Sequence, residues 1–195
     1  SAVTEERNRE AFFSRVFGVY QSVMFCCGAG IIWLCRPLML MFRSNFYEAW
    51  QFVPLLAVAT VYSCFNQFLN TIYVVEKRST LSLYTMLAGA VANCGLNFVM
   101  IPVMGPNGAT LASLLSYVLV FVLRAVNTRG LLRVDFSPLK VCFNTLLLLV
   151  EAAVMLMQAP GWAWWSTGLT ALVIALNFQG VWSMARLVLR RRKRA

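Results

Sequence analysis

The sequence contains no histidine. This absence excludes histidine-dependent catalytic triads and proton relays through imidazole, and it removes the commonest metal ligand. The six cysteines form no Cys-x-x-Cys pair, so we interpret them as small apolar side chains rather than as a zinc or redox site. We therefore predict no catalytic residue, no metal site and no cofactor, and a protein that is not an enzyme.

Charged residues are also scarce. They make up 12% of the 195 residues, against about 25% in an average soluble domain, while 60% are hydrophobic and the mean hydropathy is +0.70. A globule of this length has too little interior to bury so much apolar surface, and a disordered chain needs low hydrophobicity. The composition excludes an ordinary soluble domain and indicates a protein solvated by lipid.

Long uncharged stretches locate the membrane spans. Residues 16–35, 49–75 and 79–123 carry no charge, and only Glu151 interrupts the sequence between Lys140 and Arg186. A helix crosses the bilayer core with about 20 apolar residues, so the longest stretch holds two spans. We predict an all-α polytopic membrane bundle of six transmembrane helices, at about 14–34, 52–74, 81–102, 108–124, 139–158 and 164–184.

The two spans in the longest stretch are separated by a segment with two prolines and two glycines, residues 101–108. Such residues end one helix and begin the next, so we predict a structural hinge at Pro102, Gly105 and Gly108. Beyond the hinge, small residues recur every four positions at Gly108, Ala112 and Ser116, which predicts a seam where helices approach closely.

Basic residues divide unevenly between the two sides of these spans. The N-terminal segment, the second and fourth loops and the tail carry nearly all of them, whereas the opposite side has only Arg36 and Arg43. The positive-inside rule then places both ends in the cytoplasm, in the inner (plasma) membrane. We expect the basic tail, residues 185–195, to lie against anionic lipid headgroups. The net charge of +10 is spread along a membrane edge, which argues against a nucleic-acid partner.

The first ten residues are polar and charged and lack the pattern of a signal peptide. We interpret them as part of a connecting loop, and the chain as the C-terminal part of a larger transporter. In a two-lobed transporter the N-terminal lobe would hold the matching repeat.

Uncharged polar residues inside the spans are candidates for substrate contact. They recur at helical spacing, in the second span at Tyr62, Asn66, Asn70 and Tyr73 and in the third at Gly89, Asn93 and Asn97. Two interpretations stay open: hydrogen bonds between helices, or the polar wall of a substrate cavity.

Two charged residues are further candidates. Glu151 is placed near the middle of the fifth span, with Asn144 on the same face, and there a carboxyl must be protonated, paired or facing water. It has either a coupling or substrate-contacting role or a structural one. Arg36, at the outer end of the first span, is either an interfacial side chain or a contact for a pyrophosphate or sugar.

Several segments together resemble one known family. The resemblance covers about residues 12–125, and the last two spans match in hydropathy only. It is carried by Tyr47, Ala49, Trp50 and Pro54, by Asn66, Leu69, Asn70, Thr71 and Tyr73, by Lys77, Arg78 and Thr80, and by Asn93, Leu96, Asn97, Ile101, Pro102, Gly105, Gly108, Ala109, Thr110, Ala112 and Ser113. The sequence resembles the C-terminal part of bacterial polysaccharide flippases of the Wzx type (O-antigen and exopolysaccharide), within the MATE-like exporter superfamily.

The resemblance implies a transporter of twelve to fourteen helices in two lobes, of which these six would be the last. Such proteins move undecaprenyl-diphosphate-linked oligosaccharides from the cytoplasmic to the periplasmic leaflet by alternating access. Their charged cavity residues lie largely in helices that precede this segment, so the resemblance assigns no transport residue here. Asparagine-rich walls suit sugar hydroxyls, because amides both donate and accept hydrogen bonds.

Other functions remain open at this point. A multidrug or cation exporter of the same superfamily would favour an acidic, aromatic cavity, and only Glu151 fits that. A lipid II flippase would look much the same in this segment. Among other classes, a membrane-embedded glycosyl- or acyltransferase would need histidine or acidic residues at a membrane face, and a non-transport membrane scaffold would need neither.

Overall fold

The computed structural model describes residues 2–40, 49–158 and 160–192, and every regular element in these ranges is a helix. The predicted all-α architecture is therefore confirmed, and each predicted span overlaps one helix. The helices are α1 (Ala2–Leu40), α2 (Val53–Val75), α3 (Ser79–Met104), α4 (Pro106–Thr128), α5 (Pro138–Leu156) and α6 (Trp162–Arg192).

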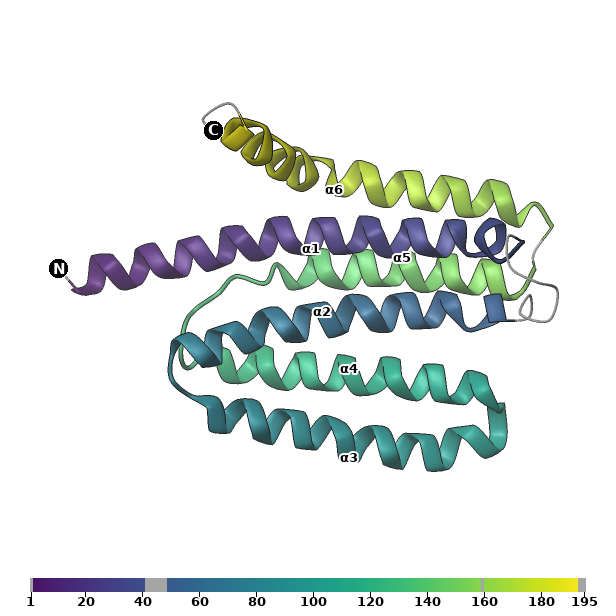
Figure 1. Ribbon diagram of the computed structural model, residues 1–195, viewed down its shortest axis with the longest axis horizontal. Helices are drawn as coiled ribbons and strands as arrows, with labels where there is room; N and C mark the ends of the chain where they lie inside the picture. Colours follow the sequence, from purple (N-terminus) through teal and green to yellow (C-terminus); the bar gives the residue numbers. More distant parts are fainter. Residues whose placement is uncertain (1, 41–48, 159, 193–195) are drawn as a thin grey trace.

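The helices run side by side and alternate in direction (Figure 1). α3 forms one edge of the bundle and packs chiefly against α4, which packs in turn against α2. α6 forms the other edge and packs against α1 and α5. The two termini lie towards the same end of the bundle as the α2–α3 and α4–α5 connections (Figure 1). Most of the basic segments identified in the sequence therefore gather at one end.

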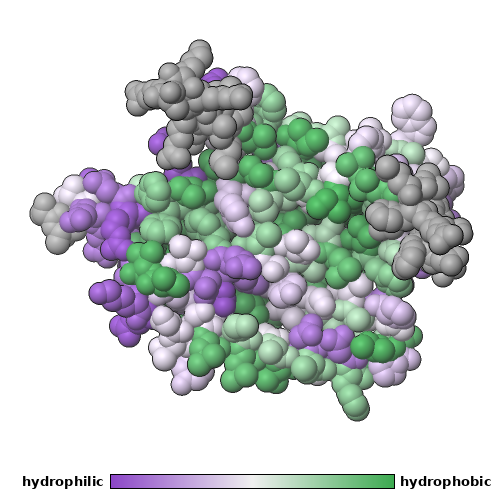
Figure 2. Space-filling model, in the orientation of Figure 1, coloured by the Kyte–Doolittle hydropathy of each residue, from purple (hydrophilic) through white to green (hydrophobic). Residues whose placement is uncertain are grey.

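The surface of the bundle is apolar. The helices α1 to α5 are long and apolar enough to cross a membrane, whereas α6 does not reach that hydropathy over its described residues. On α3, the side chains of Phe98 and Val103 are 85% and 81% exposed. Figure 2 shows hydrophobic residues over much of one face, with hydrophilic residues concentrated near the N-terminal end and in smaller patches on the face itself. These features indicate a multi-pass membrane protein.

The first and last helices, α1 and α6, are longer than predicted. α1 begins at Ala2, so the segment expected to be a connecting loop is helical, and α6 continues to Arg192 through most of the expected tail. No glycine or proline occurs between Ala2 and Arg15, and the alanine, glutamate and arginine there favour helix. The side chains of residues 187–195 lie outside the described part of the structure, as does Arg43, so the headgroup contact of the tail stays a prediction.

The N-terminal half of α1 packs against the connection between α4 and α5. The backbone N–H of Arg133 donates to Glu10 Oε1 over 3.0 Å, and the N–H of Asp135 donates to Ser14 Oγ over 2.9 Å. The Phe136 ring inserts beside Phe17, with 5.2 Å between ring centroids. The α4–α5 connection is therefore packed onto the bundle instead of projecting from it.

The segment predicted as a hinge contains the turn between α3 and α4, although its three residues do not contribute in the same way. The chain turns at Gly105, whose φ of 61° favours glycine, and α4 begins directly at Pro106. Pro102 lies inside the last turn of α3 and does not end that helix. A Cβ at Gly108 would collide with the backbone carbonyl of Met100, so this glycine allows α4 to lie against the end of α3.

Aromatic rings form the centre of the packing between α1, α2 and α4. The ring of Phe65 is fully buried and lies 5.4 to 5.8 Å from the rings of Phe25, Tyr62 and Phe121, centroid to centroid. Tilted and edge-on pairs at such distances are favourable beyond their burial. This cluster fixes α2 against α1 and α4, and thereby sets the position of the polar face of α2.

The orientation in the membrane can be tested by reporter fusions. A reporter enzyme active only in the cytoplasm should be active when fused after Arg194 and inactive when inserted at Gly161, because the basic end of the bundle is expected to face the cytoplasm. An insertion at Gly130, in the basic α4–α5 connection, is the positive control. The reverse pattern would contradict the orientation, and equal activity at Gly161 and Arg194 would show that α6 does not cross the bilayer.

Candidate functional site

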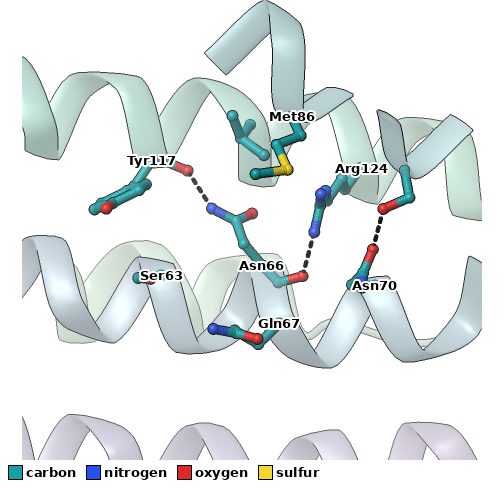
Figure 3. A pocket seen from close by; sticks show the side chains of 9 residues that line it. Ser63, Asn66, Gln67, Asn70, Met86, Tyr117 and Arg124 are labelled. Carbon is teal, nitrogen blue, oxygen red and sulfur yellow. Dashed lines mark hydrogen bonds between the residues drawn. The ribbon is translucent and has the colours of Figure 1, made fainter. Parts of the chain in front are cut away.

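A polar cavity of about 270 Å³ lies between α2, α3 and α4 (Figure 3). Amide and hydroxyl side chains form much of its wall, and it contains a single charged side chain, Arg124. It is lined by Ser63, Asn66, Gln67 and Asn70 from α2, Ser82 and Met86 from α3, and Tyr117, Val120 and Arg124 from α4. Lipid tails cannot satisfy such groups, so this face must meet water, a ligand or another protein surface.

Arg124 links the three helices around the cavity. Its side chain is only 6% exposed, its Nε–H donates to Thr85 Oγ1 over 3.0 Å, and an η nitrogen donates to the backbone carbonyl of Asn66 over 2.6 Å. The guanidinium also lies 5.9 Å from the ring centroid of Tyr73. A guanidinium has five N–H donors, so donors remain beyond these two bonds.

No carboxylate neutralises this arginine within the described part of the chain. The one salt bridge there joins Arg9 to Glu76 over 2.6 Å, at the end of the bundle. A buried cation without a counterion is costly, and an anion bound in the cavity would offset part of this cost. The cavity therefore combines an uncompensated positive charge with groups that bond to hydroxyls.

Asn66 and Asn70, both predicted from the sequence, lie in this cavity. The Asn66 side-chain amide donates to the backbone carbonyl of Tyr117 over 2.9 Å, while its Oδ1 is buried without a partner. Asn70 accepts a hydrogen bond from Ser82. Asn66 thus contributes to helix packing and also presents an unused acceptor.

Asn93 and Asn97 do not join the cavity. They are half-buried on α3, and the Asn97 amide donates to Asn93 Oδ1 over 2.9 Å within the same helix. The small residue before them, Gly89, packs against Val120, where an added Cβ would collide with the valine side chain. The polar face predicted on the third span therefore packs against α4 at Gly89, while its two asparagines bond to each other.

The predicted seam at Gly108, Ala112 and Ser116 is buried throughout, as expected.

Glu151 lies away from the cavity, between α5 and α6. Its carboxyl is fully buried, and Oε1 accepts hydrogen bonds from Ser166 Oγ over 3.0 Å and from Thr170 Oγ1 over 2.7 Å. It is predicted near the middle of its span, but α5 ends at Leu156, so Glu151 lies little more than one turn from that end. Asn144 is buried on the same face, as expected, and accepts a bond from Asn177.

Arg36 is held between two tryptophans. Its guanidinium carbon lies 4.2 Å from the ring centroid of Trp50 and 4.4 Å from that of Trp162. This arrangement joins the end of α1 to the beginnings of α2 and α6, and each cation–π contact contributes about 0.5–2 kcal/mol. The stacking favours the interfacial, structural interpretation, although the Nε is buried without a hydrogen-bond partner.

Arg124, the one charged side chain that lines the cavity, is not among the candidate residues predicted from the sequence. The fourth span is predicted to end at this residue, which places the arginine with the basic loop that follows. No glycine or proline follows before Gly130, and this was the available signal that the helix continues beyond the arginine. The described residues hold no cluster of three or more histidine, cysteine or acidic residues that could bind a metal.

Three comparisons with known proteins give no relative. The chain matches no protein family, no curated protein and no solved structure. The cavity and the residues that line it are therefore the features from which a function can be inferred.

Proposed function

We propose that this chain forms one wall of a flippase that moves a lipid-linked oligosaccharide across the membrane by alternating access. The observation that carries the proposal is the buried Arg124 without a counterion, in a cavity of amides and hydroxyls. Arginine binds phosphate oxygens through paired N–H donors, and amides suit sugar hydroxyls. The ligand proposed is an undecaprenyl-diphosphate-linked oligosaccharide.

The position of the charge supports a diphosphate close to one leaflet. Arg124 lies about one turn from the end of α4, and its guanidinium donates to the backbone carbonyl of Asn66, near the middle of α2, over 2.6 Å. A diphosphate held at the arginine would enter from the end of the bundle where α4 ends and would lie directly beside the amides that suit its sugars. With the orientation inferred from the basic residues, this end lies at the cytoplasmic leaflet of the inner membrane.

The size of the cavity supports a site with two walls. About 270 Å³ is near the lower limit for a small-molecule pocket and holds roughly one polar headgroup. An oligosaccharide needs more room, which a second helical lobe opposite α2, α3 and α4 would supply. The N-terminal lobe expected from the sequence is the partner proposed for this face.

The cavity argues against the main alternative. A cation exporter would place carboxylates or aromatic faces towards its substrate, but the cavity lining carries a positive charge and no acid. The one buried acid of the described helices, Glu151, bonds to α6 instead. A lipid II flippase carries the same diphosphate chemistry and is included in the proposal.

A binding experiment tests the class of ligand. The purified chain in nanodiscs should bind a polyprenyl-diphosphate glycan at least about tenfold more tightly than the neutral polyprenol, because charge-assisted hydrogen bonds contribute about 1.5–3 kcal/mol. A lipophilic quaternary ammonium should bind no better than it does to empty nanodiscs. Equal affinity for diphosphate and alcohol, or saturable binding of the ammonium, would overturn the proposal.

A further inference from the structure

The interface between α5 and α6 contains a second group of buried polar residues. The Asn177 amide donates to Asn144 Oδ1 over 2.6 Å, and further along the same interface Ser166 and Thr170 donate to Glu151. The side chains of Asn144, Glu151, Ser166 and Asn177 are at most 1% exposed. None of these residues lines the polar cavity between α2, α3 and α4, and their hydrogen bonds lie within the interface itself.

The carboxyl of Glu151 is incompletely bonded. The hydroxyls of Ser166 and Thr170 both donate to Oε1, while Oε2 is buried and has no hydrogen-bond partner. The one salt bridge of the described residues lies elsewhere, so no cation neutralises this carboxylate. An ionised carboxylate in such a place loses its hydration and recovers only two hydrogen bonds, which favours its neutral form.

Few charged or titratable groups face Glu151 from the surrounding helices. On α1, the Cys35 thiol interacts electrostatically with it, and Arg36 follows in sequence but is stacked between Trp50 and Trp162. α2 carries no formal charge, and α6 carries none before Arg186. The only other charge on α5 is Lys140, three turns away, whose ammonium donates to Ser22.

A metal ion does not fit this position. The described residues offer one carboxyl and two hydroxyls, whereas hard cations take six or more oxygen ligands. A proton needs only the free oxygen. We propose that Glu151 is a reversible proton-binding site whose protonation state controls the packing of α6 on α5. This inference is independent of the proposed function.

The position of Glu151 gives a proton a short path from bulk water, and its hydrogen bonds to α6 let protonation change how that helix packs. Glu151 is little more than one turn from the end of α5, and Ser166 is about one turn from the start of α6, so bulk water at the α5–α6 connection is near. The carboxylate form needs both hydroxyl donors, so Ser166 and Thr170 must stay close. The neutral form carries its own donor and accepts less strongly, which releases part of this constraint on α6.

Infrared difference spectroscopy of the full chain in nanodiscs tests the proposal. The carbonyl band of a protonated, buried carboxylic acid should be present at about pH 5 and disappear by about pH 9, as ionisation requires. Glu151→Gln should lack the band at every pH. Glu151→Asp, which keeps the acid with a shorter side chain, should show a displaced band that still titrates, and it assigns the signal if the glutamine variant does not fold.

A matched variant tests the role of the hydroxyls as positioning groups. Thr170→Val removes a donor that favours the carboxylate, so the acid band should persist to higher pH, whereas Thr167→Val, an exposed neighbour on α6, should leave its titration unchanged. Absence of a Glu151-dependent band, or a band that does not change between these pH values, would overturn the proposal. An unaltered titration in Thr170→Val would also contradict it.

Discussion

Replacing Arg124 with glutamine should weaken binding of a polyprenyl-diphosphate glycan by about 10- to 100-fold, measured on the purified chain in nanodiscs. Glutamine keeps a hydrogen-bonding side chain of moderate length but removes the only charge in the cavity. Arg124→Lys should give an intermediate loss, because an ammonium keeps the charge without the planar set of donors that matches phosphate oxygens.

Arg129→Gln is the matched control. This arginine lies directly after the same helix and is exposed, so its loss changes net charge equally without changing the cavity. Unchanged affinity in a folded Arg124→Gln protein, or an equal loss in Arg129→Gln, would contradict the assignment. Because Arg124 also bonds to α2 and α3, thermal unfolding of each variant must be measured alongside. Inorganic pyrophosphate should compete with the lipid on the unmodified chain, which tests the site without any substitution.

Gly108→Leu should destabilise the protein by about 3 kcal/mol or more. The first side-chain carbon would already overlap the carbonyl of Met100, and neither backbone can move far because Gly105 and Pro106 fix the turn between them. The expected result is a lower unfolding temperature in detergent and a lower yield of folded protein. Gly108→Ala should show most of this effect, because the collision involves Cβ itself.

Gly95→Leu provides the comparison for this substitution. Gly95 lies on the exposed side of α3, and nothing lies within 4 Å of a Cβ built there. In a bilayer the new side chain faces lipid, and leucine favours helix more than glycine does, so stability should be unchanged or slightly higher. Equal stability of the two leucine variants would contradict the packing of α4 against the end of α3.

Spans and turns were predictable because they depend on local sequence. Uncharged stretches have the length that a bilayer requires, and prolines at 106 and 138 begin helices where the fixed φ is already suitable. The extent of α1 and α4 beyond the apolar stretches was not predictable in the same way. Hydropathy indicates where the chain leaves the hydrocarbon core, whereas a helix ends where its backbone hydrogen bonds end. These two boundaries differ at the start of α1, Ala2, and at the end of α4, Thr128.

Only part of the candidate site was predictable from the sequence, as the two pairs of asparagines show. Helical spacing placed Asn66 and Asn70 on one face, and both line the cavity. The same spacing placed Asn93 and Asn97 on one face, but there the Asn97 amide donates to Asn93 Oδ1 within α3. Periodicity shows which residues share a face of a helix, but it does not show which helix packs against that face. The packing of α4 against α2, which brings Arg124 to Asn66, depends on tertiary structure.

The length of α5 has a consequence for the membranes that the protein tolerates. Its 19 residues span about 28 Å, close to the thickness of the hydrocarbon core, whereas the 39 residues of α1 span about 58 Å. In a thicker bilayer α1 can slide or tilt, but α5 has no spare turn, and Asp135 and Gln158 beyond its ends would be drawn towards the acyl chains. Hydrophobic mismatch should therefore affect α5 first, so that lipids with longer acyl chains strain this helix before any other.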